Sequence, residues 1–269
     1  MNILNYCLIV ILSIIIILLS IIFKYIYNLS FSGNKLNNKL DENDIYIITN
    51  DFCKCHDIKI YNISFKIKCN LCKIRRIINF EKEESVYYFL ENIKNNVKLL
   101  IHTEGGKSEF PDFLAYILKQ HNVNIETFIP QFATSAGSFM ALSSNIIHMN
   151  WYSCMSPIDT QIEYNSDSDD ESFPAKYIKN VKNKENAITR LKAMESEGYH
   201  QDDIFIINNI FKSNKKRKLI KKYFLDTKLS HSIKYGPKDL KKYGLNIKIG
   251  IPDNINKIFN EFKKLSMEI

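Results

Sequence analysis

The longest apolar run in the chain extends from Ile3 to Phe23, where 21 residues carry no charge and are mostly isoleucine and leucine. At the helical rise of about 1.5 Å per residue, this length is enough to cross the hydrocarbon core of a bilayer. The run has no polar face, unlike a core helix, and it continues into Lys24 and Tyr25 rather than into a small-residue cleavage site. It therefore predicts an uncleaved transmembrane helix within residues 1–27, with aromatic residues at its end.

Two shorter apolar runs, residues 97–101 and 127–130, have the composition of buried β-strands. Each is followed by a turn of small residues, at 102–106 and 133–138, and then by a helix-like segment. Alternating strands and helices predict a parallel α/β sheet. Because such a sheet carries its ligand site at the carboxyl ends of the strands, both turns are expected at the same functional edge.

The two turns contain residues suited to acyl transfer. Gly105 and Gly106 let the backbone approach a substrate and adopt positive φ, so that the N–H of Gly106 can bind an oxyanion. Ser135 precedes a predicted helix over residues 136–144, near the positive end of its dipole, and the N–H of Ala136 is a second oxyanion donor. Either motif alone is explained by a turn or a helix N-cap, but the pair favours a catalytic site.

Three motifs carry a family resemblance: IHTxGG at residues 101–106, FIPxxAxSxG at 128–137 and SPIDxQ at 156–161. With them the chain resembles the serine dehydrogenase proteinase family, which is similar to signal peptide peptidase A and, more distantly, to the Clp protease. The resemblance covers about residues 44–262. It implies an α/β domain with the ClpP/crotonase-like fold, acting as a serine peptidase and assembled as a homo-oligomer.

The resemblance also implies roles for single residues. Ser135 matches the nucleophile, while Gly106 and Ala136 match the oxyanion donors. Where the Clp protease has its catalytic histidine, this chain has Asp159, for which a structural or orienting role is expected.

The general base is the least defined part of the predicted site. Relatives of signal peptide peptidase A use a lysine downstream of the serine, and Lys176 lies at a comparable separation. Lys176 is flanked by apolar residues, namely Phe173, Ala175, Tyr177 and Ile178. Burial among them would lower the pKa of the ammonium and allow it to act as a base. His231 is the second candidate base, with a structural hydrogen bond as its alternative, and His102 is the third, with orientation of the glycine loop as its alternative.

The segments outside the domain have simple expected roles. Residues 28–43 are polar and contain turn-forming pairs, as in a linker, and residues 263–269 form a tail. Lys24, Lys35 and Lys39 follow the apolar run, whereas only the amino terminus is basic before it. The positive-inside rule therefore predicts a single-pass membrane protein whose catalytic domain is cytosolic.

Four of the six cysteines form two close pairs within residues 52–75, namely Cys53, Cys55, Cys69 and Cys72. Two pairs at the ends of a hairpin predict a structural zinc site with four thiolate ligands, for which His56 is a substitute ligand. Free thiols are the alternative in a cytosolic domain, and disulfides are the alternative in a lumen.

The formal net charge is +8, with basic residues concentrated at 215–218 and 221–222 and acidic ones at 167–171. Apolar residues alternate with the basic ones, as in an amphipathic helix whose basic face is solvated or rests on anionic lipid. The chain has no P-loop, dinucleotide-binding fingerprint or aromatic stacking platform, so no nucleic-acid partner is expected.

Together these features predict a membrane-anchored serine peptidase. Ser135 would attack a peptide carbonyl, the N–H groups of Gly106 and Ala136 would bind the oxyanion, and Lys176 would take the proton. This chemistry requires no cofactor. Two alternatives are a catalytically inactive ClpP-like membrane scaffold that binds peptides, and a crotonase-type acyl-CoA enzyme with the same glycine loop but no nucleophilic serine.

Overall fold

The computed structural model describes residues 14–21, 36–41, 45–49, 56–60, 63–67, 77–78, 83–106, 109–165, 170–178, 187–226 and 228–267. The chain divides into two compact units. The first comprises Met1–Asn43, Phe52–Arg75 and Ile258–Ile269, and the second comprises Asp44–Asp51 and Arg76–Lys257. All three sequence motifs lie in the second unit.

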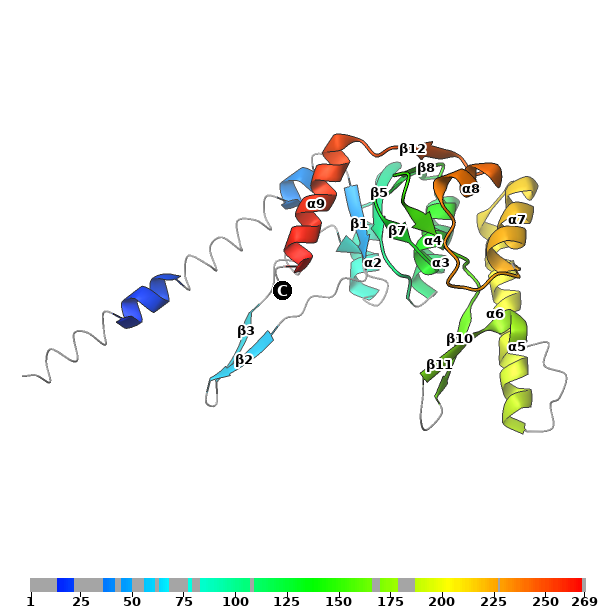
Figure 1. Cartoon of the computed structure of the whole chain (residues 1–269), viewed down its shortest axis with the longest axis horizontal. Coiled ribbons are helices and arrows are strands. Elements are labelled where there is room, and N and C mark those ends of the chain that lie inside the picture. The colour runs from blue at the N-terminus through cyan, green and yellow to red at the C-terminus, as the bar shows by residue number, and fades with distance from the viewer. Residues whose placement is uncertain are drawn as a thin grey trace, which may run out of the picture. The chain divides into compact units, whose positions relative to one another are not determined.

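A parallel sheet forms the centre of the second unit, with the strand order β12-β8-β6-β5-β1-β4 (Figure 1). Its strands are β1 (Ile45–Thr49), β4 (Ile77–Ile78), β5 (Asn96–His102), β6 (Asn124–Ile129), β8 (Ile146–Met149) and β12 (Ile247–Ile249). The sequence of β1, IYIIT, has no polar alternation, and all its residues are buried. Strands of this kind require a sheet that is covered on both faces, which is the usual setting of a parallel sheet. The predicted parallel α/β architecture is confirmed.

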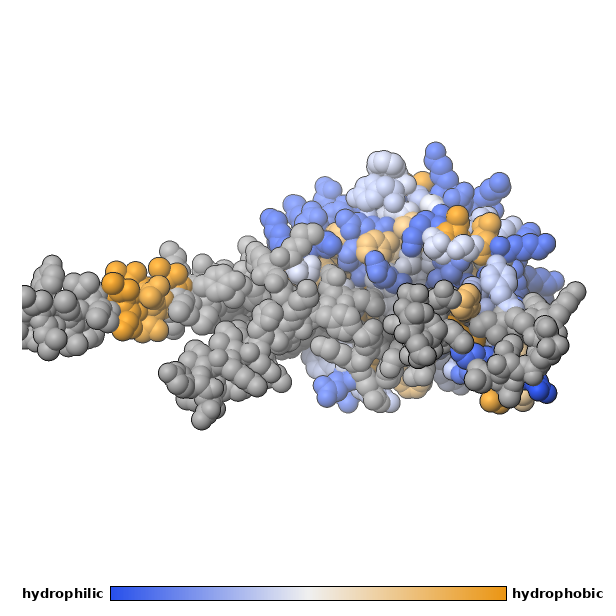
Figure 2. Space-filling model, turned by 60° about the horizontal axis from the view of Figure 1, so that its bottom comes forward, coloured by the Kyte–Doolittle hydropathy of each residue, from blue (hydrophilic) through white to orange (hydrophobic). Residues whose placement is uncertain are grey.

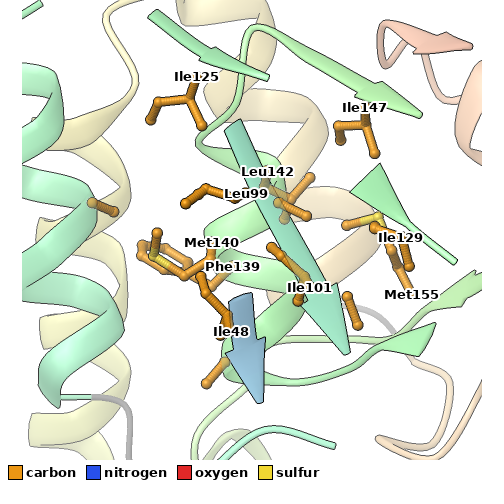
Figure 3. Packing of buried hydrophobic residues seen from close by; sticks show 14 of the residues in the cluster. Ile48, Leu99, Ile101, Ile125, Ile129, Phe139, Met140, Leu142, Ile147 and Met155 are labelled. Carbon is orange, nitrogen blue, oxygen red and sulfur yellow. The ribbon is translucent and has the colours of Figure 1, made fainter. Parts of the chain in front are cut away.

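Helices alternate with these strands along the chain. They are α2 (Glu83–Glu91), α3 (Glu109–Gln120), α4 (Ala136–Leu142), α6 (Ala187–Ile210), α8 (Pro237–Lys242) and α9 (Asp253–Met267). Every residue of α4 is buried, and α3 packs against both α4 and α6. Phe139 and Leu142 of α4 pack beside Leu99 and Ile101 of β5 in the core (Figure 3). The helix that follows Ser135 is therefore fixed by packing along its whole length.

Two short strands place the predicted nucleophile. β7 (Phe132–Ala133) pairs in parallel with β9 (Cys154–Met155), and Ala133 also forms a β-bridge with Thr103. Thr103 directly follows β5, so the bridge brings the turn after β7 beside the turn after β5. The edge predicted to carry both turns is present in the structure.

The elements after the third motif include an antiparallel hairpin of β10 (Gln161–Asn165) and β11 (Asp170–Pro174), followed by the short helix α5 (Ala175–Ile178). The helix expected at the basic run is α7 (Asn214–Ile220), which continues into a π-helical turn over Lys221–Leu225. Its side chains Ile220 and Phe224 are buried, as an amphipathic helix requires.

The first unit contains residues 36–41 in a helix, the end of α9, and an antiparallel hairpin of β2 (His56–Ile60) and β3 (Ile63–Ile67). Leu36 and Leu40 are buried, and Lys39 forms an ion pair with Glu261 of α9. The hairpin lies in the segment 52–75 where one was expected. Cys53, Cys55, Cys69 and Cys72, the predicted zinc ligands, lie outside the described residues.

Residues 14–21 are helical and exposed. None of the helices in the described part of the chain combines the length and the apolar character that a membrane crossing requires. The other residues of the predicted anchor, 1–13 and 22–27, are outside that part.

Candidate active site

Ser135 occupies a strained turn between β7 and α4. Its backbone angles are φ 52° and ψ −120°, and Asn122 is the other non-glycine residue with positive φ in the described part of the chain. A side chain with Cβ adopts this region only at an energetic cost of about 1–3 kcal/mol, which is typical of functional sites. The Ser135 hydroxyl makes no capping hydrogen bond to α4. Ser135 is thus the N-cap residue of α4 by position, but its side-chain oxygen does not cap the helix.

Two other serines hold this turn in place. The backbone N–H of Ser135 donates to Ser156 Oγ at 2.8 Å. The N–H of Ser156 donates to Ser138 Oγ at 2.9 Å, and Ser138 Oγ donates to the carbonyl of Ala133 at 2.7 Å. Because Ser138 and Ser156 are buried, these bonds compete little with water and fix the strained backbone.

The glycine loop lies directly against Ser135. The N–H of Thr134 donates to the Thr103 carbonyl at 3.0 Å, and Thr134 Oγ1 donates to the Glu104 carbonyl at 2.8 Å. Gly105 has a φ of 124°, and a Cβ built on it would lie 2.7 Å from the Cβ of Ser135. Only glycine permits this approach, because any larger residue would be strained and would also collide with Ser135.

The turn and the loop open into one cavity with a volume of about 680 Å³. Gly106, Ser135 and Ala136, the predicted oxyanion donors and nucleophile, all line it. Gly106 also has a positive φ of 128°. The structure therefore brings together at one cavity wall the three groups that the sequence places at two separate turns.

Asp159 joins the two leading candidates for the general base. Its buried carboxylate accepts from His231 Nδ1 at 3.0 Å on Oδ1 and forms an ion pair with Lys176 Nζ at 3.0 Å on Oδ2. Gln161 Nε2 donates to the same Oδ2 at 3.2 Å. Asp159 lines the cavity, whereas Lys176 and His231 lie behind it and are not among the lining residues. The aspartate thus connects both candidates to the cavity that contains Ser135.

The Lys176 ammonium contacts a carboxylate and one of the aromatic neighbours that the sequence places beside it. Lys176 is buried, with 7% of its surface exposed. Phe173 and Tyr177, expected to cover it, are themselves 43% and 49% exposed. Ala175 is buried, however, and Lys176 Nζ lies 5.2 Å from the centroid of the Tyr177 ring. The Lys176 ammonium is also stabilised by the Asp159 carboxylate.

His102, the third candidate base, is the last residue of β5. Its ring is buried and packs on Phe132, with 4.3 Å between ring centroids. It does not line the cavity. This position favours the alternative role of supporting the glycine loop.

Another part of the cavity wall is acidic and was not found from the sequence. Asp112 of α3 and Asp203 of α6 both line it. Burial and the nearby charge of Asp203 raise the pKa of Asp112 to about 8. Burial also raises the pKa of Asp203 to about 7, although a hydrogen bond from Thr160 Oγ1 at 2.9 Å acts in the other direction. Both carboxyl groups therefore titrate near neutral pH.

One sequence signal could have identified part of this wall. Several residues of α6 that line the cavity are spaced by three or four positions, as on one helix face: Lys192, Glu195, Tyr199, Asp203 and Ile206. Asp112 has no such signal, because it belongs to a different helix and only the fold brings it to the cavity.

Within the described residues, no group of three or more histidine, cysteine or acidic side chains is arranged to hold a metal ion. Cys154 is a free, partly exposed thiol, and burial raises its pKa. The predicted four-thiolate zinc site is untested, because its cysteines fall outside the described part of the chain.

The fold and the Ser135 site define a ClpP-like α/β protein with the elements of a serine-protease site. The chain belongs to the family of ClpP-like serine proteinases of the SDH type, whose model matches residues 8–268. The family resemblance carried by the three motifs is confirmed.

Two curated relatives are uncharacterized proteins of Methanocaldococcus jannaschii. One is 38% identical over 66 residues, which is 24% of this chain and 23% of the relative. The other is 22% identical over 176 residues, which is 62% of this chain and 59% of the relative. The matches thus span less than two thirds of either relative.

Two solved structures are similar to this chain at low sequence identity. The 1510-N membrane protease specific for a stomatin homolog, from Pyrococcus horikoshii, is 12% identical, with 81% of this chain and 77% of that chain covered and a TM-score of 0.31. A mutant of ClpP1 from Listeria monocytogenes is 14% identical, with 82% and 99% covered and a TM-score of 0.43.

Proposed function

We propose that this chain is a serine peptidase in which Ser135 is the nucleophile. The observation that carries the proposal is the contact between Ser135 and the glycine loop at the wall of a large cavity. A strained serine with an uncommitted hydroxyl, beside backbone N–H groups that have no side chain to cover them, is the arrangement that acyl transfer requires. Membership of the proteinase family supports the same chemistry.

In the proposed reaction, Ser135 Oγ attacks the carbonyl carbon of a peptide bond and its proton passes to the general base. The oxyanion that forms is held by the N–H groups of Gly106 and Ala136, both at the cavity wall. The base then returns the proton to the leaving amine, which gives an acyl-enzyme. Water hydrolyses this ester by the same steps in reverse order. Every proton is transferred between named groups, so no cofactor is required.

We assign the base to Lys176, with Asp159 as its positioning residue. Lys176 is buried beside the cavity, and Asp159 fixes its ammonium from a position on the cavity wall. A lysine accepts a proton only in its neutral form, so substrate binding must separate Lys176 from Asp159 or remove its proton first.

His231 is the alternative base within the same function. Its Nδ1 is held by Asp159 Oδ1, an arrangement in which a carboxylate orients an imidazole for proton transfer. The choice between Lys176 and His231 decides the mechanism but not the reaction.

Peptide hydrolysis by single variants tests the function and the base. The full chain in non-ionic detergent is incubated with a fluorogenic peptide library, and initial rates are compared for Ser135→Ala, Lys176→Ala and His231→Ala. We expect no turnover by the first two and retention of activity by the third, with Lys248→Ala, an exposed lysine on β12, as the control. Activity in Ser135→Ala would contradict the proposal. Loss of activity in His231→Ala but not in Lys176→Ala would assign the general base to His231.

A peptide-binding scaffold without catalysis is the second candidate function. It is favoured by the ion pair in which Asp159 holds the Lys176 ammonium, because a lysine accepts no proton while it is held as an ammonium. Under this alternative, peptides from the library bind the full chain with equal affinity before and after Ser135→Ala and remain intact.

We also propose that the amino-terminal segment anchors the protein in a membrane as a single-pass helix, with the catalytic domain in the cytosol. Residues 14–21 support this, since their large apolar side chains are 49–60% exposed and form a continuous apolar surface (Figure 2). Alkaline extraction of membranes from expressing cells tests the anchor. The chain is expected in the pellet, and its release into the supernatant would contradict an integral anchor.

Assembly into a homo-oligomer is proposed on the basis of the family. Multi-angle light scattering of the purified full chain, corrected for detergent, is expected to give a multiple of the 31.5 kDa chain mass. A monomer at micromolar concentration would contradict it.

A further inference from the structure

Four lysines gather around two adjoining cavities at the ends of α3 and α6, away from Ser135. Lys119, Lys212 and Lys216 line a cavity of about 260 Å³. Lys215 and Lys216 line a second cavity of about 290 Å³, so that Lys216 belongs to both. The two cavities also share Asn145 and Ser213 and are named here the lysine furrow. Of the residues described in the structure, no aspartate or glutamate lines either of them.

The positive charge of the lysine furrow is not balanced by the protein. Among the residues that the structure describes, none of the four lysines forms an ion pair with a carboxylate. The contacts that are present are to neutral groups: Lys212 Nζ donates to Asn122 Oδ1 at 3.3 Å and Lys216 Nζ donates to the Ser144 carbonyl at 3.2 Å. Lys216 Nζ also lies 5.2 Å from the centroid of the Phe211 ring.

This arrangement is electrostatically costly without a counter-ion. Burial, together with the charge of Lys119, lowers the pKa of Lys216 to about 8. Burial and the charge of Lys212 lower the pKa of Lys119. Lysines without a carboxylate partner normally extend into water, where their charges are screened. Here three of them converge on a small cavity from α3, α7 and the α6–α7 connection.

We propose that the lysine furrow binds a compact phosphate-bearing anion. Ammonium groups act as point charges that suit phosphate oxygens, and three of them around one small cavity match an anion of two or more charges. Neutral donors are available beside them, because Asn145 uses its Oδ1 to accept from Ile125 and retains its NH₂ group. The phosphate is either a small soluble ion or the headgroup of a phospholipid. This inference does not depend on the proposed peptidase activity.

Calorimetric titration with inorganic pyrophosphate tests the furrow directly. The full chain in non-ionic detergent is titrated at fixed ionic strength, as wild type and as Lys119→Gln/Lys216→Gln. Because hydrogen bonds to charged groups contribute strongly, we expect the double variant to bind at least about 30-fold more weakly than wild type. The matched control is Lys218→Gln, an exposed lysine of α7 that lines neither cavity and should change the affinity by less than about twofold.

A second variant keeps the test decisive if the double variant fails to fold. Lys212 is exposed, so Lys212→Gln keeps the packed residues and should still weaken binding by about fivefold. Equal binding by wild type and by both lysine-furrow variants would overturn the proposal.

Vesicles distinguish the two sources of phosphate. Because the proposed anchor would insert into any vesicle, sedimentation is read as the increase that follows when phosphatidic acid is added to phosphatidylcholine vesicles, and this increase is compared for wild type and Lys212→Gln. Lysine-dependent pyrophosphate binding supports a soluble ligand, and lysine-dependent binding confined to phosphatidic acid vesicles supports a headgroup. If pyrophosphate does not bind and vesicle binding is the same in both proteins, the proposal is wrong.

Discussion

Gly105 and Ser135 are in such close contact that a Cβ on the glycine would lie 2.7 Å from the Cβ of the serine. The contact joins the turn after β5 to the turn after β7, and it places backbone N–H groups beside the proposed nucleophile. It also makes the identity of residue 105 a sensitive test of the site.

Gly105→Ala is therefore expected to reduce peptide hydrolysis by about 100-fold, the scale of losing an oxyanion interaction. It should also lower the free energy of unfolding by at least about 2 kcal/mol, because alanine is strained at a φ of 124°. Steady-state kinetics and urea denaturation measure the two effects. The control is Gly198→Ala in α6, where nothing lies within 4 Å, and it should stabilise the protein by about 0.5–1 kcal/mol. Full activity in Gly105→Ala would show that the loop is not part of the site.

Asp159→Asn tests the residue that joins both base candidates. The substitution removes the charge that holds Lys176 and His231, so we expect hydrolysis to fall by about 100-fold. The free energy of unfolding should fall by about 3 kcal/mol, because Lys176 is left as a buried charge without its ion pair. Asp226→Asn removes an exposed carboxylate 3.6 Å from His200 and serves as the control, with a change below about 0.5 kcal/mol. If Asp159→Asn retains full kcat, neither Lys176 nor His231 depends on Asp159 for proton transfer.

Ser156→Ala tests the support of the strained turn. It removes the acceptor of the Ser135 N–H, and an unsatisfied buried donor costs about 1–3 kcal/mol. We expect unfolding at lower urea concentration together with a lower kcat and a nearly unchanged KM, because the nucleophile is less well positioned. Ser232→Ala, at an exposed serine, should change neither quantity. An unchanged kcat would mean that the turn keeps its conformation without this bond.

The acidic wall of the cavity predicts a pH dependence of stability. The pKa values of Asp112 and Asp203 are raised to about 8 and about 7, so the folded state binds more protons than the unfolded state above pH 4. The free energy of unfolding should therefore fall as the pH rises from about 4 to about 8. An asparagine side chain would not ionise, so Asp112→Asn should reduce the fall in the free energy of unfolding. We expect it to stabilise the protein by about 2 kcal/mol at pH 8 but little at pH 4.

Urea denaturation at a series of pH values measures this effect. Glu91→Gln, an exposed carboxyl at the end of α2, should leave the pH dependence unchanged. A wild-type stability that is flat between pH 4 and pH 8 would show that neither aspartate is desolvated.

The sequence predicted those features that are local. The apolar runs before the two turns appear as β5 and β6, and the helix after Ser135 begins at Ala136 as expected. Both turns meet at one sheet edge because parallel strands impose that geometry. The family motifs lie in these same segments, which explains why the resemblance was clearest there.

The sequence could not choose the base or place Asp112 in the acidic wall. Lys176 and His231 reach Asp159 from elements separated by α6, so only the fold shows that they share one carboxylate. Asp112 and Asp203 come from two helices that pack together, and burial is the largest cause of their raised pKa values.

Labelling with a fluorophosphonate probe tests the central claim most directly. The full chain is treated at neutral pH, and the adduct is counted by intact mass and located by peptide mapping. The account predicts one adduct per chain on Ser135 that is absent from Ser135→Ala. Folded protein that takes up no probe, or an adduct that persists in Ser135→Ala, would contradict it.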